Sequence, residues 1–131
     1  MDTVCTCLPG ATLWLDGPAR HAMAEDLAMR LRADQHRRVE VLDAEDAGVP
    51  CEHPHAAAER IGLVAEILAR NGILAVVLSA AGPTERDAAR ARHQRAGTAF
   101  LELPAAGPGI PAPSADALLA LLAEHGLVLA D

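Results

Sequence analysis

Short apolar runs recur along the chain at regular intervals, separated by longer segments of mixed character. Four of these runs have the length and composition of buried strands. They lie at residues 11–16, 38–43, 73–80 and 98–104. The third run, ILAVVLSA, is apolar without alternation, as expected for a central parallel strand covered on both faces. We therefore expect 73–80 to be the most buried strand.

Four further segments are expected to be helical: three place apolar residues at the helical spacing of three and four, and the segment 84–95 is short and polar. They cover residues 20–33, 55–70, 84–95 and 115–125. In 55–70, Glu66 precedes Arg70 by one turn, which favours an ion pair on the helix surface. Ser114 is a predicted N-cap of the last helix. The four segments are therefore predicted to be helices.

Strands that alternate with helices at this spacing indicate right-handed βαβ units and a parallel sheet. We expect one α/β domain over residues 1–131, with three α/β/α layers and four or five parallel strands. Residues 127–130, LVLA, are the predicted fifth strand, at one edge of the sheet.

The composition of the chain limits the classes of partner that it can bind. The chain has 11 arginines and no lysine against 18 acidic residues, a net charge of −7, which argues against nucleic acid and membrane surfaces as partners. No apolar run reaches the roughly 20 residues that span a bilayer. Three cysteines and an N-terminus unlike a signal peptide predict a cytoplasmic location.

The turn after the first run, Asp16-Gly17-Pro18-Ala19-Arg20-His21, lies where many α/β proteins bind phosphate. A P-loop needs glycine N–H groups, a lysine and a following serine or threonine. Here Pro18 has no N–H, Asp16 repels an anion, and the chain holds no lysine. Two interpretations stay open: a purely structural turn, or a weaker anion site at the helix N-terminus beside Arg20 and His21.

Three longer stretches share their order and spacing with a known family. These stretches resemble segments of the adenylylsulfate (APS) kinases. They are ATLWLDG, LAMRLRADQHRRVEVLDAED and ERIGLVAEILARNGILAVVLSAAGPTERDAARAR. The resemblance implies a P-loop kinase fold and a link to sulfate assimilation. It also implies a homodimer or a partner enzyme, since members of that family pair as dimers and are in some cases fused to ATP sulfurylase.

The chain departs from this family at the positions that bind ligands there. The first turn is shorter and lacks the GxxGSGKS core, and the long lid with its KGLY element is missing. Asp43 matches the first acid of the family's LDGD, and Glu45 is the nearest match to the second. Arg60 matches the last arginine of DREENIRRIG, while Arg86 and Asp87 match a later Arg-Asp pair.

Positions that match the family are those expected to pack, and positions that fail are those expected to bind. We therefore expect a catalytically inactive APS-kinase-like domain, a pseudokinase without a cofactor, that acts by protein interaction or regulation. An enzyme of altered chemistry in a biosynthetic pathway, using the old crevice, is the alternative. The residues that this enzyme would use are Asp43, Glu45, His53, His55, Arg60 and Arg86. Arg20, His21 and Asp87 are further candidate ligand-binding residues, and any of these polar residues can also be an ordinary surface or capping residue.

A third interpretation is a metal-binding protein. Cys5 and Cys7 alternate, as do Cys51, His53 and His55, a spacing that an extended segment can use for zinc or copper. The first pair precedes the first strand whereas the second group follows the second strand. The two groups thus start from opposite edges of a sheet roughly 17–20 Å deep, which argues against a shared site.

Overall fold

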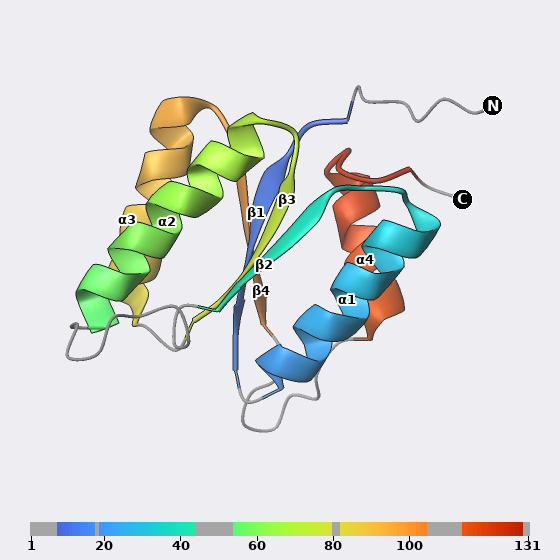
Figure 1. Cartoon of the computed structure of the whole chain (residues 1–131), viewed down its shortest axis with the longest axis horizontal. Helices are drawn as coiled ribbons and strands as arrows, with labels where there is room; N and C mark the ends of the chain where they lie inside the picture. The colour runs from blue at the N-terminus through green and yellow to red at the C-terminus, as the bar shows by residue number, and fades with distance from the viewer. Residues whose placement is uncertain (1–7, 18, 44–53, 80–81, 105–113, 130–131) are drawn as a thin grey trace.

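Strands and helices alternate throughout the part of the chain that the computed structural model describes, residues 8–17, 19–43, 54–79, 82–104 and 114–129 (Figure 1). The strands are β1 (Ala11–Asp16), β2 (Val39–Asp43), β3 (Leu74–Leu78) and β4 (Ala99–Pro104). The helices are α1 (Arg20–Asp34), α2 (Pro54–Arg70), α3 (Pro83–Ala96) and α4 (Ala115–Glu124). Each coincides with a range predicted from periodicity, and its ends differ by one or two residues at most, as helix and strand ends commonly do.

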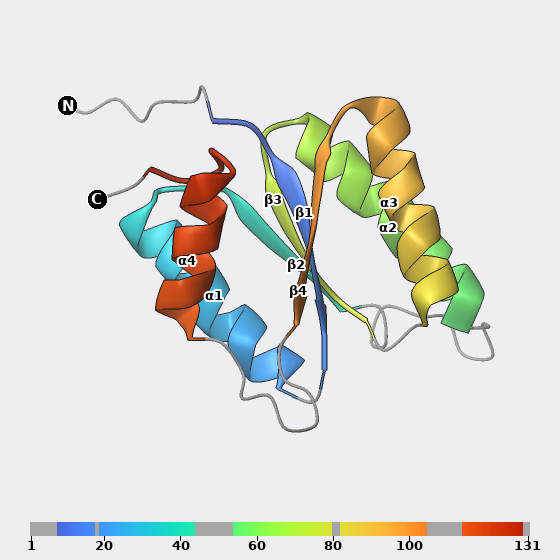
Figure 2. The same cartoon turned by 180° about the vertical axis from the view of Figure 1, so that it is seen from behind.

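The four strands form one parallel sheet in the order β2-β3-β1-β4. Helices α2 and α3 cover one face of this sheet, and α1 and α4 cover the other (Figures 1 and 2). The predicted three-layer α/β/α architecture is therefore confirmed.

Successive side chains of the central strands point to opposite faces of the sheet, so the hydrophobic core has two parts. Leu13 and Leu15 of β1 pack in the larger cluster, with α1 and α4, whereas Trp14 packs in the smaller one, with Ile61 and Ala65 of α2. All five residues of β3 are buried, as predicted for the central strand.

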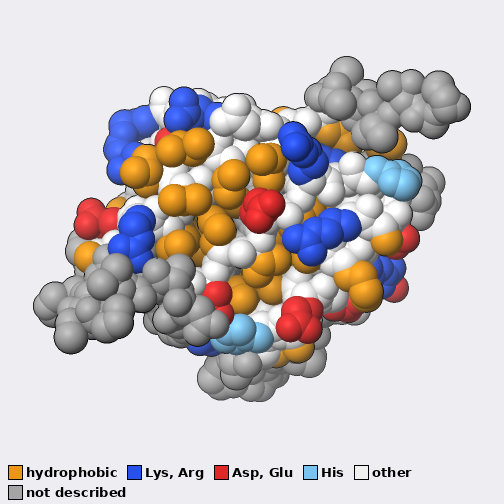
Figure 3. Space-filling view, viewed as in Figure 1, with side chains coloured by type: hydrophobic (Ala, Val, Ile, Leu, Met, Phe, Trp, Pro, Cys, Tyr) orange, Lys and Arg blue, Asp and Glu red, His pale blue; other side chains and the backbone are white. Residues whose placement is uncertain are grey.

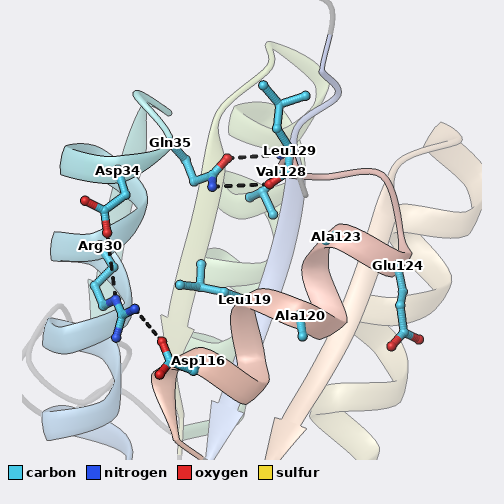
Figure 4. A pocket seen from close by; sticks show the side chains of 10 residues that line it. All are labelled: Arg30, Asp34, Gln35, Asp116, Leu119, Ala120, Ala123, Glu124, Val128 and Leu129. Atoms are coloured by element: carbon cyan, nitrogen blue, oxygen red, sulfur yellow. Dashed lines mark hydrogen bonds and ion pairs between the residues drawn. The ribbon is translucent and has the colours of Figure 1, made fainter. Parts of the chain in front are cut away.

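The predicted strand at 127–130 is wrong for the residues that the structure describes, since 127–129 form no strand. Leu127 and Val128 are buried in the α1/α4 core instead. The side chain of Gln35, at the end of α1, accepts from the N–H of Leu129 at 3.0 Å and donates to its carbonyl at 3.3 Å (Figure 4). These contacts replace the partners that a neighbouring strand would provide.

The amino edge of the sheet, where the strands begin, is held by hydrogen bonds from one buried side chain to main-chain carbonyls. Arg37 is 9% exposed and donates hydrogen bonds to the carbonyls of Leu127, Pro9 (2.7 Å) and Gly72 (3.3 Å). Burial lowers the pKa of this guanidinium from its ordinary value. One side chain thus joins three segments that are distant in the sequence.

Two local predictions about the helices are also confirmed. The Ser114 hydroxyl accepts from the N–H of Ala117 at 3.0 Å and caps α4. Glu66 pairs with Arg70 in α2, although Glu66 is buried and not on the surface. Within the described ranges, no helix is long and apolar enough to cross a membrane.

Candidate functional site at the carboxyl edge of the sheet

Parallel strands end at one edge, and the helices that follow them begin there, so this edge collects most of the predicted residues. Figure 1 shows it at the bottom of the sheet, where α1, α2 and α3 begin. Arg20 and His21 open α1, Asp43 ends β2, and Arg86 and Asp87 lie in the first turns of α3. Arg60 lies in the second turn of α2. Glu45 lies outside the described residues.

The turn between β1 and α1 is closed by hydrogen bonds between its own residues. Gly17 has φ 111°, a left-handed conformation that favours glycine. Its carbonyl accepts from the backbone N–H of Arg20 at 3.2 Å and from the Arg20 guanidinium at 2.9 Å. Ala19, at the N-cap position of α1, has no side chain that can cap the helix. The cationic side chain nearest this turn is therefore bound to a main-chain carbonyl of the turn itself.

His21 and Asp43 come together across the edge. The Nε2 of His21 lies 3.0 Å from Oδ2 of Asp43, and the two side chains are 56% and 19% exposed. A carboxylate in this position orients the imidazole ring. Sequence analysis flagged both residues separately, and the fold makes them a pair.

Arg86 and Asp87 belong to a chain of ion pairs between α3 and the ends of β1 and β4. The Nε of Arg86 lies 2.9 Å from Glu102, and its Nη1 lies 3.7 Å from Asp16. Arg90 contacts both Glu102 and Asp87, the latter at 2.7 Å. Three carboxylates thus surround two guanidinium groups, and the cationic charge at this position is neutralised within the chain.

Glu102 and Arg90 were not predicted as part of this edge. Two features of the sequence could have indicated them. Glu102 is a charged residue within the apolar fourth run, and Arg90 follows Arg86 by one turn, which places both arginines on one helix face. The guanidinium of Arg90 also lies 5.6 Å from the centre of the Phe100 ring, a cation–π distance.

His93 is a third residue that was not predicted from the sequence. It is fully buried between α3 and β1, with Nδ1 2.7 Å from the carbonyl of Ala89 and Nε2 2.6 Å from the hydroxyl of Thr12. Nδ1 must donate to the carbonyl, and in a neutral ring Nε2 then accepts from the hydroxyl. Burial lowers the pKa of His93, against smaller opposing effects of the Ala89 carbonyl and Glu66. This histidine is packed and fully hydrogen-bonded, which fits a structural role.

The predicted metal ligands cannot be placed. Cys5, Cys7, Cys51 and His53 lie outside the described residues, as does the side chain of His55, whose backbone belongs to α2. Among the residues that are described, no group of three or more His, Cys, Asp or Glu side chains could hold a metal ion.

A hollow of about 940 Å³ lies away from this edge, between α1 and α4 (Figure 4). Arg30 pairs with Asp116 across it and with Asp34 on its own helix. Leu119 and Val128 also line it. None of the predicted ligand-binding residues is among the side chains drawn there.

Solved structures identify the fold. APE1195 is 30% identical to this chain with a TM-score of 0.63, over 73% of this chain and 60% of APE1195. The hexameric APS kinase from Thiobacillus denitrificans is 23% identical with a TM-score of 0.74, over 94% of this chain and 30% of that one. The Mycobacterium tuberculosis APS kinase CysC is 23% identical with a TM-score of 0.69, over 89% of this chain and 97% of that one.

The chain thus spans less than two thirds of the length of the first two neighbours. No protein-family model and no curated protein matches the sequence. The parallel sheet in the order β2-β3-β1-β4, its two helical layers and these structural matches together show that the chain has the fold of the P-loop kinases, among them the APS kinases.

Proposed function

We propose that this chain is an APS-kinase-like domain that transfers no phosphoryl group and acts by binding protein. The observation that carries the proposal is the first turn. Phosphoryl transfer on this fold needs backbone N–H groups around the phosphates and a lysine to neutralise them. Gly17 is the one glycine in the turn, Arg20 is bonded to its carbonyl, and the chain contains no lysine.

The charges around this turn support the same conclusion. Asp16 and Asp43 end their strands, and Glu102 lies two residues before the end of β4, so a triphosphate at this edge would meet carboxylates. Arg86 and Arg90 are already paired with acids of the same chain. An anionic ligand would have to compete with these carboxylates for the arginines.

The neighbours suggest the context in which such a domain acts. Those with a stated activity are APS kinases, and one of them is hexameric. We infer association with a second copy or with an enzyme of sulfur or nucleotide metabolism, in a regulatory role.

Two measurements on the purified chain test this proposal. The first is a kinase assay with Mg-ATP and adenylylsulfate, in which we expect no 3′-phosphorylated product. The second is a thermal-shift panel with ATP, adenylylsulfate, its 3′-phosphorylated product, sulfate and zinc. A ligand at about 100 times its Kd stabilises a protein by about 2.7 kcal/mol, so binding would be evident. Product formation overturns the proposal.

The His21–Asp43 pair favours a second candidate, an enzyme of altered chemistry. An imidazole held by a carboxylate is a common general base, and this one lies at the edge where α/β proteins bind ligands. A neutral activated ester, p-nitrophenyl acetate, is the probe. This candidate predicts that His21→Gln abolishes hydrolysis while His125→Gln, at an exposed histidine after α4, retains it. Equal rates in both variants exclude it.

A further inference from the structure

Helix α4 carries apolar side chains on two faces. Leu118 and Leu122 are buried in the core between α4 and the sheet. Leu119, Ala120 and Ala123 instead line the hollow between α1 and α4, which we call the α1/α4 hollow (Figure 4). A surface helix normally presents polar side chains on the face that it does not bury. The second apolar face of α4 is therefore a surface that another molecule can cover.

The hollow exists because small side chains separate two contacts between the helices. Arg30 of α1 pairs with Asp116 near the start of α4, and Gln35 bonds to the backbone of Leu129 beyond its end (Figure 4). Between these contacts α4 presents two alanines, whose single methyl groups do not fill the space between two helices. The remaining volume of about 940 Å³ is in the range of ligand-binding clefts.

Acidic side chains lie along the whole hollow. Asp34 and Asp116 are 63% and 77% exposed, and Glu124, the last residue of α4, is exposed as well. Arg30 is the one base in the lining, and Asp34 and Asp116 share it. Within the described part of the chain, no ion pair joins Glu124 to another residue. Three acids against one base give the lining a charge of −2, which favours a cationic occupant.

The length of the hollow favours a helix as this occupant. Asp116 and Glu124 are eight residues apart on α4, which is about 12 Å along the helix axis. A partner helix beside α4 covers the same distance in a little over two turns, with aliphatic side chains between basic residues at either end. The two alanines allow this helix to approach closely, since the distance between packed helices depends on the side chains at the contact.

Helix α2 has another exposed apolar surface, which serves as a comparison. Its residues Leu63, Val64 and Ile67 are 40%, 37% and 41% exposed. Figure 3 shows hydrophobic side chains gathered over α2, on the face that Figure 1 presents to the viewer. Because α2 covers the opposite face of the sheet from α1 and α4, a ligand that needs apolar surface alone would bind at either place. A ligand that also needs the acids would bind in the α1/α4 hollow.

We propose that the α1/α4 hollow binds a cationic amphipathic helix of a partner protein. Its aliphatic side chains pack on Leu119, Ala120 and Ala123, and its lysines or arginines pair with Asp116 and Glu124. The inference rests on the proposed function as a domain that acts by binding protein, and it names the chemistry of the partner. Exposed ion pairs add little affinity but set orientation and speed association. A contact of this size is at the small end of protein interfaces, so the expected Kd is micromolar.

Fluorescence anisotropy of a labelled synthetic helix, titrated with the full chain, tests this proposal. The probe is an alanine-based peptide of about 18 residues, with leucines at three- and four-residue spacing and two lysines about two turns apart. Wild type should bind it with a micromolar Kd that rises between about 30 and 300 mM salt.

Two variants with the same change of charge locate the probe. Ala120→Arg places a bulky cation in the hollow and should raise the Kd roughly tenfold or more, whereas Ile67→Arg on α2 should leave it unchanged. Both positions are exposed and arginine is a good helix former, so both variants should fold as wild type does by circular dichroism. Glu124→Gln removes one acid at the exposed end of α4 and should raise the Kd roughly two- to fivefold.

Five outcomes overturn the proposal. They are no saturable binding by wild type, a wild-type Kd in Ala120→Arg or in Glu124→Gln, equal weakening by Ile67→Arg, equal binding of a peptide of the same composition with its leucines dispersed, and displacement of the probe by equimolar spermidine, which would make the hollow a site for a small cation. The kinase assay separates this failure from failure of the proposed function. A chain that neither binds the probe nor forms 3′-phosphorylated product refutes the α1/α4 site alone, whereas a chain that does both refutes the proposed function alone.

Discussion

The two edges of the sheet are held together by different physical means. At the amino edge, buried Arg37 donates to main-chain carbonyls, and Gly10 packs directly on the backbone of Ala69 and Ile73. At the carboxyl edge, side chains pair with one another in contact with solvent, as Arg86 does with Glu102 and His21 does with Asp43.

This difference means that the two edges contribute unequally to the stability of the fold. Buried hydrogen bonds to a charged group contribute substantially to stability, whereas exposed ion pairs contribute little. The carboxyl edge, where this fold binds ligands, therefore adds little to stability, and its acids neutralise the arginines that would otherwise attract an anion. The predictions below test this contrast, from the largest expected effect to the smallest.

Arg37→Met should have the largest effect. The substitution keeps most of the side-chain volume but leaves the buried carbonyl of Leu127 and the partly buried carbonyls of Pro9 and Gly72 without their donor. We expect a loss of about 3 kcal/mol in the free energy of unfolding, measured by urea denaturation. Arg37→Lys should recover part of it, because lysine keeps the charge but not the planar donor geometry. A loss under about 1 kcal/mol would show that Arg37 does not hold this edge.

Gly10→Ala should destabilise the same edge through sterics. A Cβ at this position would lie 2.3 Å from the carbonyl oxygen of Ala69 and 2.7 Å from that of Ile73, and both are backbone atoms. The backbone must move, at an expected cost of about 2–3 kcal/mol. Gly62→Ala in α2 is the matched control, since its Cβ would meet only Ala89, at 3.4 Å. Equal melting temperatures for the two variants would contradict the packing at Gly10.

His93 makes stability depend on pH. Its folded pKa lies below its unfolded value of about 6.5, so the unfolded chain binds more protons in the window between the two values. Stability should therefore fall as the pH decreases below about 6.5, by at most about 1.4 kcal/mol per pH unit for one proton. In His93→Asn this slope should be smaller by the contribution of His93, as urea denaturation at several pH values will reveal. An unchanged slope would mean that His93 titrates normally.

Glu102→Gln should have the smallest effect on stability. Glu102 is 37% exposed, and the arginines it contacts are 27% and 32% exposed, so we expect a change below about 1 kcal/mol. The same substitution removes a negative charge beside Arg86 and Arg90, and any gain in sulfate affinity by calorimetry would measure how far this acid blocks anions. A loss as large as that of Arg37→Met would abolish the contrast between the edges.

The elements were predictable because their signals are local. A run such as 73–80 or a cap such as Ser114 depends on residues a few positions apart. His93 and Arg37 were not predictable, because their partners Thr12 and Leu127 are 81 and 90 residues away.

The wrong prediction of a strand at 127–130 has a related cause. An apolar tetrapeptide has the same pattern whether it pairs in a sheet or covers a core, and here Gln35 provides the backbone partners of Leu129. At the carboxyl edge, sequence analysis identified His21, Asp43 and Arg86 but not the acids that neutralise Arg86, because Asp16 and Glu102 come from strands that only the fold makes neighbours.

The most direct test of the central claim is an amide NMR titration of the chain with Mg-ATP and then adenylylsulfate. The amides of Gly17, Arg20 and His21 report on the carboxyl edge, and those of Gly10 and Gly72 at the amino edge provide an internal reference. We predict no saturable shift at either edge. A saturable shift confined to Gly17, Arg20 and His21 would show that this turn still binds a nucleotide phosphate, and would contradict the account.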